Sequence, residues 1–151
     1  DTEKAKIAGL LHDLAREVPA NELLPRTRAF GIVVSDIEQA EPILLHSILG
    51  SRLAQIEFGI NDEEVLQAII LHTTGGQSMT VLDKIIYLAD LIEPNRSFKG
   101  INEIREVAQK DLDQALLAAL DQSIDYLIKR CGLIHPATIA ARNEILLKKN
   151  L

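Results

Sequence analysis

The apolar residues of this chain recur at helical spacing in nearly every segment, and this pattern limits the possible folds more than any other feature. In the longest segment, residues 111–130, one stripe holds Leu112, Leu116, Leu120, Ile124 and Leu127. Of the 151 residues, 47% are hydrophobic but only 3% are aromatic. Leu, Ile and Ala, which form or tolerate helices, supply most of the apolar content. The sequence therefore predicts an all-α fold.

Prolines and glycines divide this pattern into separate helices. We expect helices over residues 3–16, 42–57, 61–72, 80–93, 103–109, 111–130 and 136–149. Asn61, with Glu64 three residues later, resembles a capping box at the start of one of them. Residues 18–41 contain two prolines and a glycine, which predicts short helical turns and loops. Residues 32–34 could form a strand, but this strand would have no partner.

The length and continuity of the chain predict one domain. No repeat, low-complexity tract or linker divides the 151 residues, which suffice for a single helical bundle over residues 1–151. The sequence begins at Asp1 within a helical pattern. We therefore expect part of the first helices to be missing from it.

The charge and the single cysteine exclude several classes of protein. A net charge of −6 provides no basic field for a nucleic acid or an anionic membrane. No apolar run approaches the roughly 18–20 residues of a membrane span, and no signal segment opens the sequence. Cys131 alone excludes an intrachain disulfide and suits a reducing compartment, so we expect a cytoplasmic protein. An anionic substrate would need a local source of positive charge.

A histidine and an aspartate stand side by side within the apolar stretch AGLLHDLARE, residues 8–17. His12 shares a helical face with small residues, and Asp13 lies about 100° further round the same helix. The two side chains could therefore converge on one point. The alternative is a hydrogen-bonded core histidine beside a surface aspartate.

Three more polar residues lie where apolar side chains are expected. His46 and His72 occupy apolar helix faces, where each is either a structural histidine or a ligand. Asp90 lies on a helix that is apolar on nearly every side, and an unpaired carboxylate there would cost several kcal/mol. It therefore needs a partner, which is either a cation or an arginine such as Arg96 or Arg105.

Together these residues form a candidate metal site. Three histidines and two aspartates on four predicted helices match no local metal-binding motif, so the signal is their combination. Mixed imidazole and carboxylate ligands suit Fe, Mn, Co or Zn better than Ca or Mg, and helix bundles commonly aim such ligands inward.

Several segments, in this order, resemble the HD-domain metal-dependent phosphohydrolases: AGLLHD, LLHS, LHTTG, MTVLDKIIYLADLIEPNRSFKG and IHPATIAARN. Within that superfamily the sequence is most similar to the YqeK-type symmetrical bis(5'-nucleosyl)-tetraphosphatases. The resemblance spans essentially the whole chain, and HTTG followed by ADLIEPNR is specific to this branch. It implies an all-helical fold and symmetrical hydrolysis of diadenosine tetraphosphate into two nucleoside diphosphates.

The resemblance also implies roles for the candidate ligands. His12, Asp13 and Asp90 would hold a divalent first-row metal, expected to be iron, with Mn or Co as alternatives and one or two ions in total. Asp13 and Asp90 would be catalytic through attack by a metal-bound hydroxide. His46 and His72 would hold a second metal or contact the substrate phosphates.

Further residues would bind the substrate: Arg16, Thr73, Arg96, Gly132, His135 and Pro136. Arg16 and Arg96 would stabilise charge on the phosphate oxygens. Alternative structural roles remain for two of these segments, because TTGG at 73–76 could simply end a helix and His135 could cap the last one.

The sequence departs from the family pattern at two places. Family members have another ligand histidine some tens of residues before the His-Asp pair, whereas eleven residues precede His12 here. Leu14 and Arg16 stand where members often have an aromatic residue and a lysine. The guanidinium fork of Arg16 would contact a phosphate differently from an ammonium group.

Two other functions fit the same residues. One is a different HD phosphohydrolase activity, on nucleotides or guanosine alarmones, and the other is a nucleotide-binding sensor without turnover. In each case the partner is a small nucleotide. A homodimer is also compatible with the sequence, because the apolar stripe of residues 111–130 could be core or a dimer face.

Overall fold

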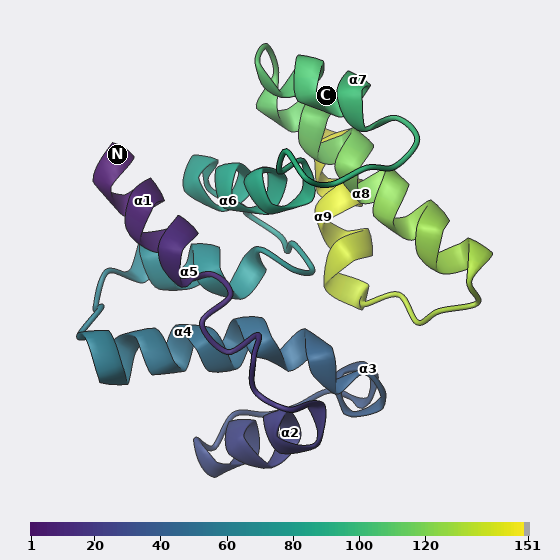
Figure 1. Ribbon diagram of the computed structural model, residues 1–151. Coiled ribbons are helices and arrows are strands. Elements are labelled where there is room, and N and C mark those ends of the chain that lie inside the picture. The colour runs from purple at the N-terminus through teal and green to yellow at the C-terminus, as the bar shows by residue number, and fades with distance from the viewer. Residues whose placement is uncertain (150–151) are drawn as a thin grey trace.

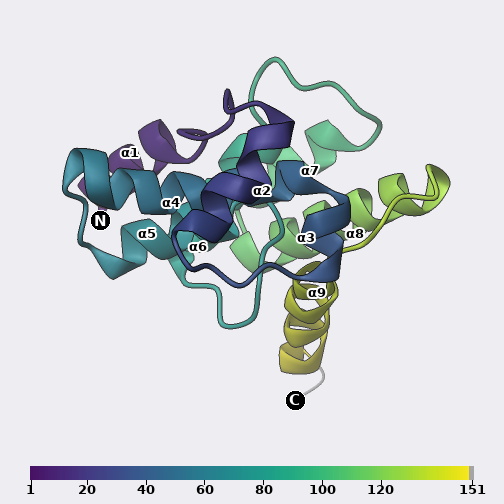
Figure 2. The same ribbon diagram turned by 90° about the horizontal axis from the view of Figure 1, so that it is seen from below.

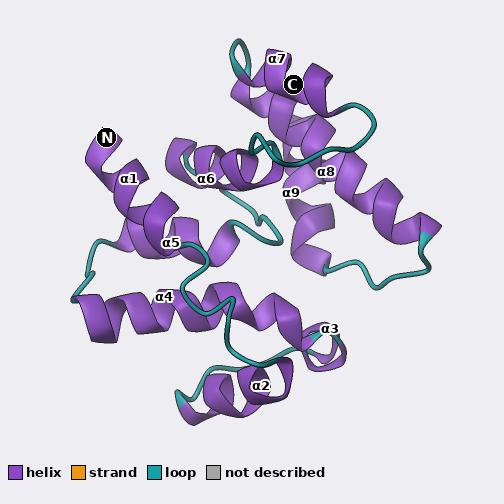
Figure 3. Ribbon diagram, in the orientation of Figure 1, coloured by secondary structure: helices purple, strands orange, loops and turns teal. Residues whose placement is uncertain are grey.

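The computed structural model describes residues 1–149 and is built from helices throughout (Figures 1 and 3). Within these residues there are nine α-helices, one short 3-10 helix (η1) and no strand, which confirms the all-α prediction. The elements are α1 (Thr2–Leu11), α2 (Ala20–Ala29), α3 (Asp36–Ala40), η1 (Pro42–Leu44), α4 (Leu45–Phe58), α5 (Glu63–Leu71), α6 (Val81–Leu91), α7 (Ile101–Ala108), α8 (Leu112–Lys129) and α9 (Pro136–Lys149). The last two residues of the predicted domain, 150 and 151, lie outside the described part. None of the helices in residues 1–149 is long and apolar enough to cross a membrane.

Helix α6 occupies the centre of the arrangement. It packs against α1 and α5 on one side and against α8 on the other (Figure 1). Helix α5 also packs on α4, and α8 also packs on α7 and α9. The view from below shows α2 lying across α4 and α9 projecting away from the other helices (Figure 2). Residues on α6 can therefore face both the N-terminal helices and α8.

The core consists of three apolar clusters, and α6 contributes to two of them. Tyr87 and Leu88 pack with Leu116 and Leu120 of α8, while Ile86 packs with residues of α1, α4 and α5. The third cluster lies between α2, α4 and the segment after α1. Leu116 and Leu120 are buried, so this part of the α8 stripe is core. Burial of this kind contributes about 1.5–3 kcal/mol for each leucine side chain.

The first helix is shorter than predicted. It ends at Leu11 rather than residue 16, and residues 12–18 form successive turns. Backbone hydrogen bonds three residues apart hold these turns, for example Arg16 N to Asp13 O at 2.8 Å. Asp13 is therefore not further round the same helix as His12, but in the turn that follows. The turn backbone lies against α4, since a Cβ at Gly50 would lie 3.5 Å from the Ala15 nitrogen. This tertiary contact prevails over helix propensity.

Most other boundaries agree with the sequence, with small differences. The predicted helix 42–57 starts as η1 and continues as α4, which ends at Gly59 in the left-handed conformation (φ 66°). Asp62, not Asn61, caps α5, because its carboxylate accepts from the nitrogens of Glu64 and Val65 at 3.0 and 3.2 Å. Residues 32–34 form a loop rather than a strand.

Candidate active site

Three histidines meet where α1, α4 and α5 approach one another. His12 directly follows α1, His72 directly follows α5, and His46 is the second residue of α4. The ring centroids of His12 and His46 lie 4.9 and 5.0 Å from that of His72. His46 and His72 are buried, whereas His12 is partly exposed. The sequence placed these residues on separate helices, and the fold brings them together.

Each of the three rings is fixed in the same way. The Nδ1 atoms of His12, His46 and His72 lie 2.7, 2.5 and 2.7 Å from the backbone oxygens of Gly9, Ile43 and Ile69, respectively. A carbonyl oxygen can only accept, so each Nδ1 carries the proton and donates it to the carbonyl three residues earlier. These carbonyls belong to helical turns. The arrangement leaves a lone pair on every Nε2 atom.

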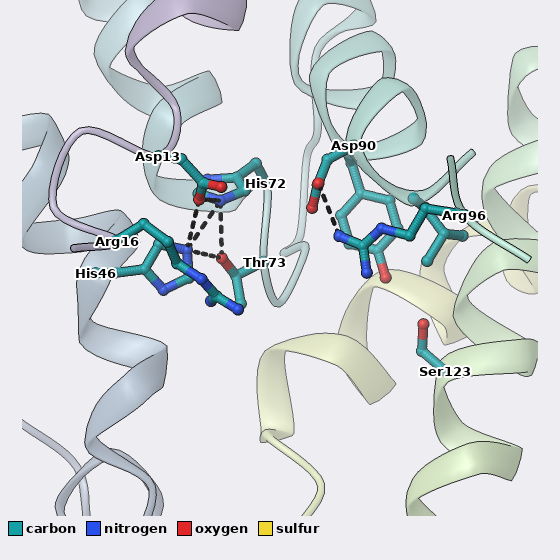
Figure 4. Close-up of a pocket in the computed structure, with 10 residues that line it drawn as sticks. Asp13, Arg16, His46, His72, Thr73, Asp90, Arg96 and Ser123 are labelled. Carbon is teal, nitrogen blue, oxygen red and sulfur yellow. Dashed lines mark hydrogen bonds and ion pairs between the residues drawn. The ribbon is translucent and has the colours of Figure 1, made fainter. Parts of the chain in front are cut away.

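The free Nε2 atoms point at one another and at a carboxylate (Figure 4). His46 Nε2 and His72 Nε2 lie 3.1 Å apart, and Asp13 Oδ1 lies 3.2 and 3.5 Å from them. Two nitrogen lone pairs at this distance repel unless a proton or a cation lies between them. The Thr73 hydroxyl, 3.2 and 3.1 Å from the two nitrogens, can donate to only one of them.

Burial makes a proton an unfavourable bridge. It lowers the pKa of both His46 and His72 below the ordinary value, because the charged imidazolium loses its hydration inside the protein. The nearby Asp13 carboxylate acts in the opposite direction but does not reverse this effect. Neutral imidazole nitrogens and carboxylate oxygens are the donors that first-row metal ions prefer. The residues present therefore fit a metal ion.

Two overlapping groups could each hold an ion. One contains Asp13, His46 and His72, and the other contains His12, His72 and Asp90; the ligand atoms within each group lie within 4.8 Å of one another. His72 belongs to both. His12 Nε2 lies 3.6 Å from Asp13 Oδ2 and 4.0 Å from Asp90 Oδ1, so the predicted set of His12, Asp13 and Asp90 also gathers here.

Asp90 has an arginine partner in this structure. Arg96 donates from Nη2 to Asp90 Oδ1 at 3.0 Å, as one alternative from the sequence anticipated (Figure 4). Arg105, the other arginine considered, instead donates to the backbone oxygens of Ile92, Glu93 and Arg96. It thereby secures the loop that carries Arg96.

These residues line a cavity of about 220 Å³, which we call the central cavity. Its walls include Asp13, Arg16, His46, His72, Asp90 and Arg96. Tyr87 and Ser123 also line it, although no sequence pattern singled them out. Tyr87 lies one turn before Asp90 on α6, and burial raises the pKa of its hydroxyl. This spacing is the one signal that could have indicated Tyr87.

A larger cavity of about 730 Å³ adjoins the central cavity, and we call it the first side cavity. Arg16, Thr73, Tyr87 and Ser123 line both cavities. Gly132 and His135, two of the predicted substrate-binding residues, line the first side cavity, and Pro136 begins α9.

Two segments with alternative roles have structural functions. His135 Nδ1 accepts from the nitrogen of Ala137 at 3.2 Å and so caps α9, as the alternative proposed. In the TTGG segment, the Gly75 nitrogen donates to Leu71 O at 2.9 Å with Gly75 left-handed (φ 65°), which ends α5. Both segments nevertheless lie at the cavities, through His135, Thr73 and Thr74.

Comparisons with known proteins agree with this geometry. Residues 1–95 match the model of the HD domain family. A relative from Halalkalibacterium halodurans is 41% identical over 149 residues, which cover 99% of this chain and 79% of the relative. One from Bacillus subtilis is 38% identical over 143 residues, which cover 95% of this chain and 76% of the relative. Both are named "Bis(5'-nucleosyl)-tetraphosphatase, symmetrical".

A solved structure shows the same fold. A Clostridium acetobutylicum protein described as an HD superfamily hydrolase involved in NAD metabolism superimposes with a TM-score of 0.95 at 44% identity, covering 98% of this chain and 78% of that one. The residues that the family model matches include the five candidate metal ligands. The alignment with the relative from Halalkalibacterium halodurans also covers α7–α9. The chain belongs to the HD-domain family, in the branch whose relatives are named symmetrical bis(5'-nucleosyl)-tetraphosphatases.

Proposed function

We propose that this protein is a metal-dependent hydrolase that cleaves dinucleoside tetraphosphates, and diadenosine tetraphosphate in particular, symmetrically into two nucleoside diphosphates. The observation that carries the proposal is the convergence of three Nδ1-anchored histidines and two aspartates at a cavity that two arginines also line. Relatives at 38–41% identity bear the name of this activity.

The five ligand candidates would hold one or two divalent first-row ions, with iron as our expectation and Mn or Co as alternatives. A bound ion would supply two things at this site, a lowered pKa of coordinated water and neutralisation of phosphate oxygens. Asp13 and Asp90 are catalytic in this proposal because their carboxylates would hold the ion that activates water and neutralises the phosphate oxygens.

Two arginines provide the local positive charge that an anionic substrate needs in this acidic protein. Arg16 and Arg96 line the central cavity, where their planar guanidinium groups can each donate two hydrogen bonds to phosphate oxygens. Arg96 now pairs with Asp90. If Asp90 held a cation and a polyphosphate were bound, the guanidinium would exchange one anionic partner for another.

The first side cavity has the properties of a nucleoside site. Leu44, Leu133 and Tyr126 give it apolar and aromatic walls, and Thr74 and His135 add polar groups. Thr73 and Arg16 lie at its border with the central cavity, where the phosphates next to that nucleoside would lie.

Metal analysis of the purified protein, followed by product analysis with diadenosine tetraphosphate, tests this function. We expect a bound first-row metal and ADP as the sole nucleotide product. ATP with AMP would contradict symmetrical cleavage. Faster turnover of a guanosine alarmone or a nucleoside monophosphate would favour another HD phosphohydrolase, and binding without turnover by the metal-loaded protein would favour a sensor.

Three finer expectations accompany the proposal. We expect a cytoplasmic protein that acts on a small nucleotide rather than on a nucleic acid. A homodimer stays a prediction, which sedimentation of the metal-loaded protein would test. Residues Gly132, His135 and Pro136 stay predicted contacts of the bound nucleotide.

A further inference from the structure

Another cavity, of about 420 Å³, also adjoins the central cavity, and we call it the second side cavity. It lies between the end of α6, the loop that follows α6, and α8. Its walls include Leu91, Arg96, Ser97, Phe98, Gln122 and Tyr126. Of these residues, Leu91 and Arg96 also line the central cavity, and Tyr126 also lines the first side cavity.

The second side cavity shares part of its lining with the central cavity, as the first side cavity does. Leu91, Arg96 and Ser123 line both the central and the second side cavity. An arginine thus stands at each border, Arg16 toward the first side cavity and Arg96 toward the second. The close-up shows Arg16 beside His46 and Arg96 beside Asp90, well apart from each other in this view (Figure 4).

A symmetrical substrate requires this kind of duplication. If the central phosphoanhydride of a dinucleoside tetraphosphate is cleaved, each half carries two phosphates and one nucleoside away from the reacting centre. The two nucleosides must therefore lie in two places, each about two phosphates from the ligand cluster. One cavity beyond the central one would leave the second nucleoside without a binding site.

The lining of the second side cavity suits a nucleobase. Phe98 and Tyr126 offer aromatic faces on which a base can stack, and Gln122 offers an amide that can both donate to and accept from a base edge. Tyr126 is 51% exposed, so its ring is accessible from the cavity. The Tyr126 hydroxyl accepts from Arg130 Nη1 at 2.6 Å, and this bond holds the ring in place between the two side cavities.

We propose that the second side cavity binds the second nucleoside of the substrate, with Phe98 as the stacking surface, Gln122 as a base contact and Arg96 on the adjoining phosphates. This inference rests on the proposed function and adds a specificity site to it. A preference for substrates with two nucleosides over substrates with one would then depend on residues of the loop after α6.

The test compares two substrates that differ by one nucleoside, diadenosine tetraphosphate and adenosine 5'-tetraphosphate, with the metal-loaded full-length protein. The variants are Phe98→Leu, which keeps an apolar side chain against the core but removes the aromatic face, and Gln122→Ala on α8. We expect Phe98→Leu to lower the ratio of kcat/KM values, dinucleotide over mononucleotide, about tenfold, as for the loss of one base–aromatic contact. Gln122→Ala should lower the ratio several-fold.

The matched control is Phe58→Leu, the same change at an exposed aromatic residue at the end of α4, which should leave the ratio unchanged. Both kcat/KM values are measured on one preparation. A loss of folded protein therefore lowers both equally and leaves their ratio unchanged. If the mononucleotide is not turned over, its inhibition constant against the dinucleotide replaces its kcat/KM. A ratio unchanged in both cavity variants would overturn the inference while leaving the proposed function intact, whereas a wild-type protein that cleaves no dinucleotide would overturn both.

Discussion

At the scale of single residues, the site depends on how each imidazole is oriented. The sequence predicted that His12, His46, His72, Asp13 and Asp90 belong together, and the fold gathers all five. It could not predict the common anchoring of the Nδ1 atoms, because that depends on the rotamer of each ring relative to the carbonyl three residues earlier. The anchors fix the tautomer of each ring, and this makes the cluster suitable for a cation.

Replacing Asp90 by asparagine tests its assignment as a ligand. The amide keeps the size of the side chain but removes the charge, so metal content and turnover of diadenosine tetraphosphate should fall together, the turnover by at least about 100-fold. Elemental analysis and product analysis of one preparation would measure both. Asp125→Asn, on the exposed face of α8, is the matched control and should change neither. Full metal content in Asp90→Asn would rule out this role.

The presence of His72 in both ligand groups gives a second prediction, which concerns the number of bound ions. His72 belongs to both groups, whereas His46 belongs to one. If two ions bind, His72→Gln should abolish the binding of both and His46→Gln should leave one. Metal stoichiometry measured at saturating free metal would show the difference. Equal stoichiometry in the two variants would contradict the assignment of His72 to both ligand groups.

At the scale of elements, helix ends supply the site, and the sequence predicted these ends with unequal success. Gly59, Pro136 and the glycine-rich segment after α5 end or begin helices where expected, because their backbone preferences act locally. The first helix was predicted to continue to residue 16 but ends at Leu11, because packing of residues 12–18 on α4 is a long-range contact. A local pattern carries no information on such a contact.

Substitutions at Gly50 test how much this contact between α4 and the turn after α1 matters. A Cβ there would lie 3.5 Å from the Ala15 nitrogen and 3.7 Å from the His12 oxygen, which is ordinary contact, so Gly50→Ala should fold normally. Gly50→Val adds two methyl groups against the same backbone, and we expect it to lower the free energy of unfolding by about 1–3 kcal/mol. It should also weaken metal binding, because the displaced turn carries His12 and Asp13. Urea denaturation and metal titration of both variants would check this, and a valine variant equal to the alanine variant in both would contradict it.

At the scale of the whole molecule, the cavities lie where the N-terminal helices and α6 approach the C-terminal helices. Arg16, Arg96 and Ser123 come from three distant parts of the sequence. Among the described residues, neither candidate ligand group includes a residue of α7–α9, whereas residues of α8 line the cavities. Sequence patterns indicate candidate ligands because the chemistry of histidine and aspartate on apolar faces is distinctive. Tyr87 and Ser123 line the cavity, but residues of these types are common in any helix. Only the tertiary arrangement identifies them as lining residues.

The burial of His46 and His72 predicts how the stability of the metal-free protein depends on pH. In the unfolded chain both imidazoles bind protons with a pKa near 6.5, whereas burial lowers their pKa in the folded state. Between these values the unfolded state binds more protons, so the stabilising contribution is fully present above pH 6.5 and decreases as the pH falls through the folded-state values. Urea midpoints measured with a chelator should therefore be similar at pH 8 and pH 7.5 and should decline from pH 7 toward pH 5.

The double variant His46→Gln/His72→Gln separates these two groups from all others. It removes both imidazoles, so its midpoint should decline less between pH 7 and pH 5 than that of the parent protein, whatever its absolute stability. With saturating metal the parent should be more stable at pH 7.5 and should lose that gain on acidification, because protons compete with the ion for the same Nε2 atoms. An equal decline in the double variant and the parent would show that the pH dependence arises elsewhere, and a metal-induced gain that persists at pH 5 would show that the ion is not bound through these imidazoles.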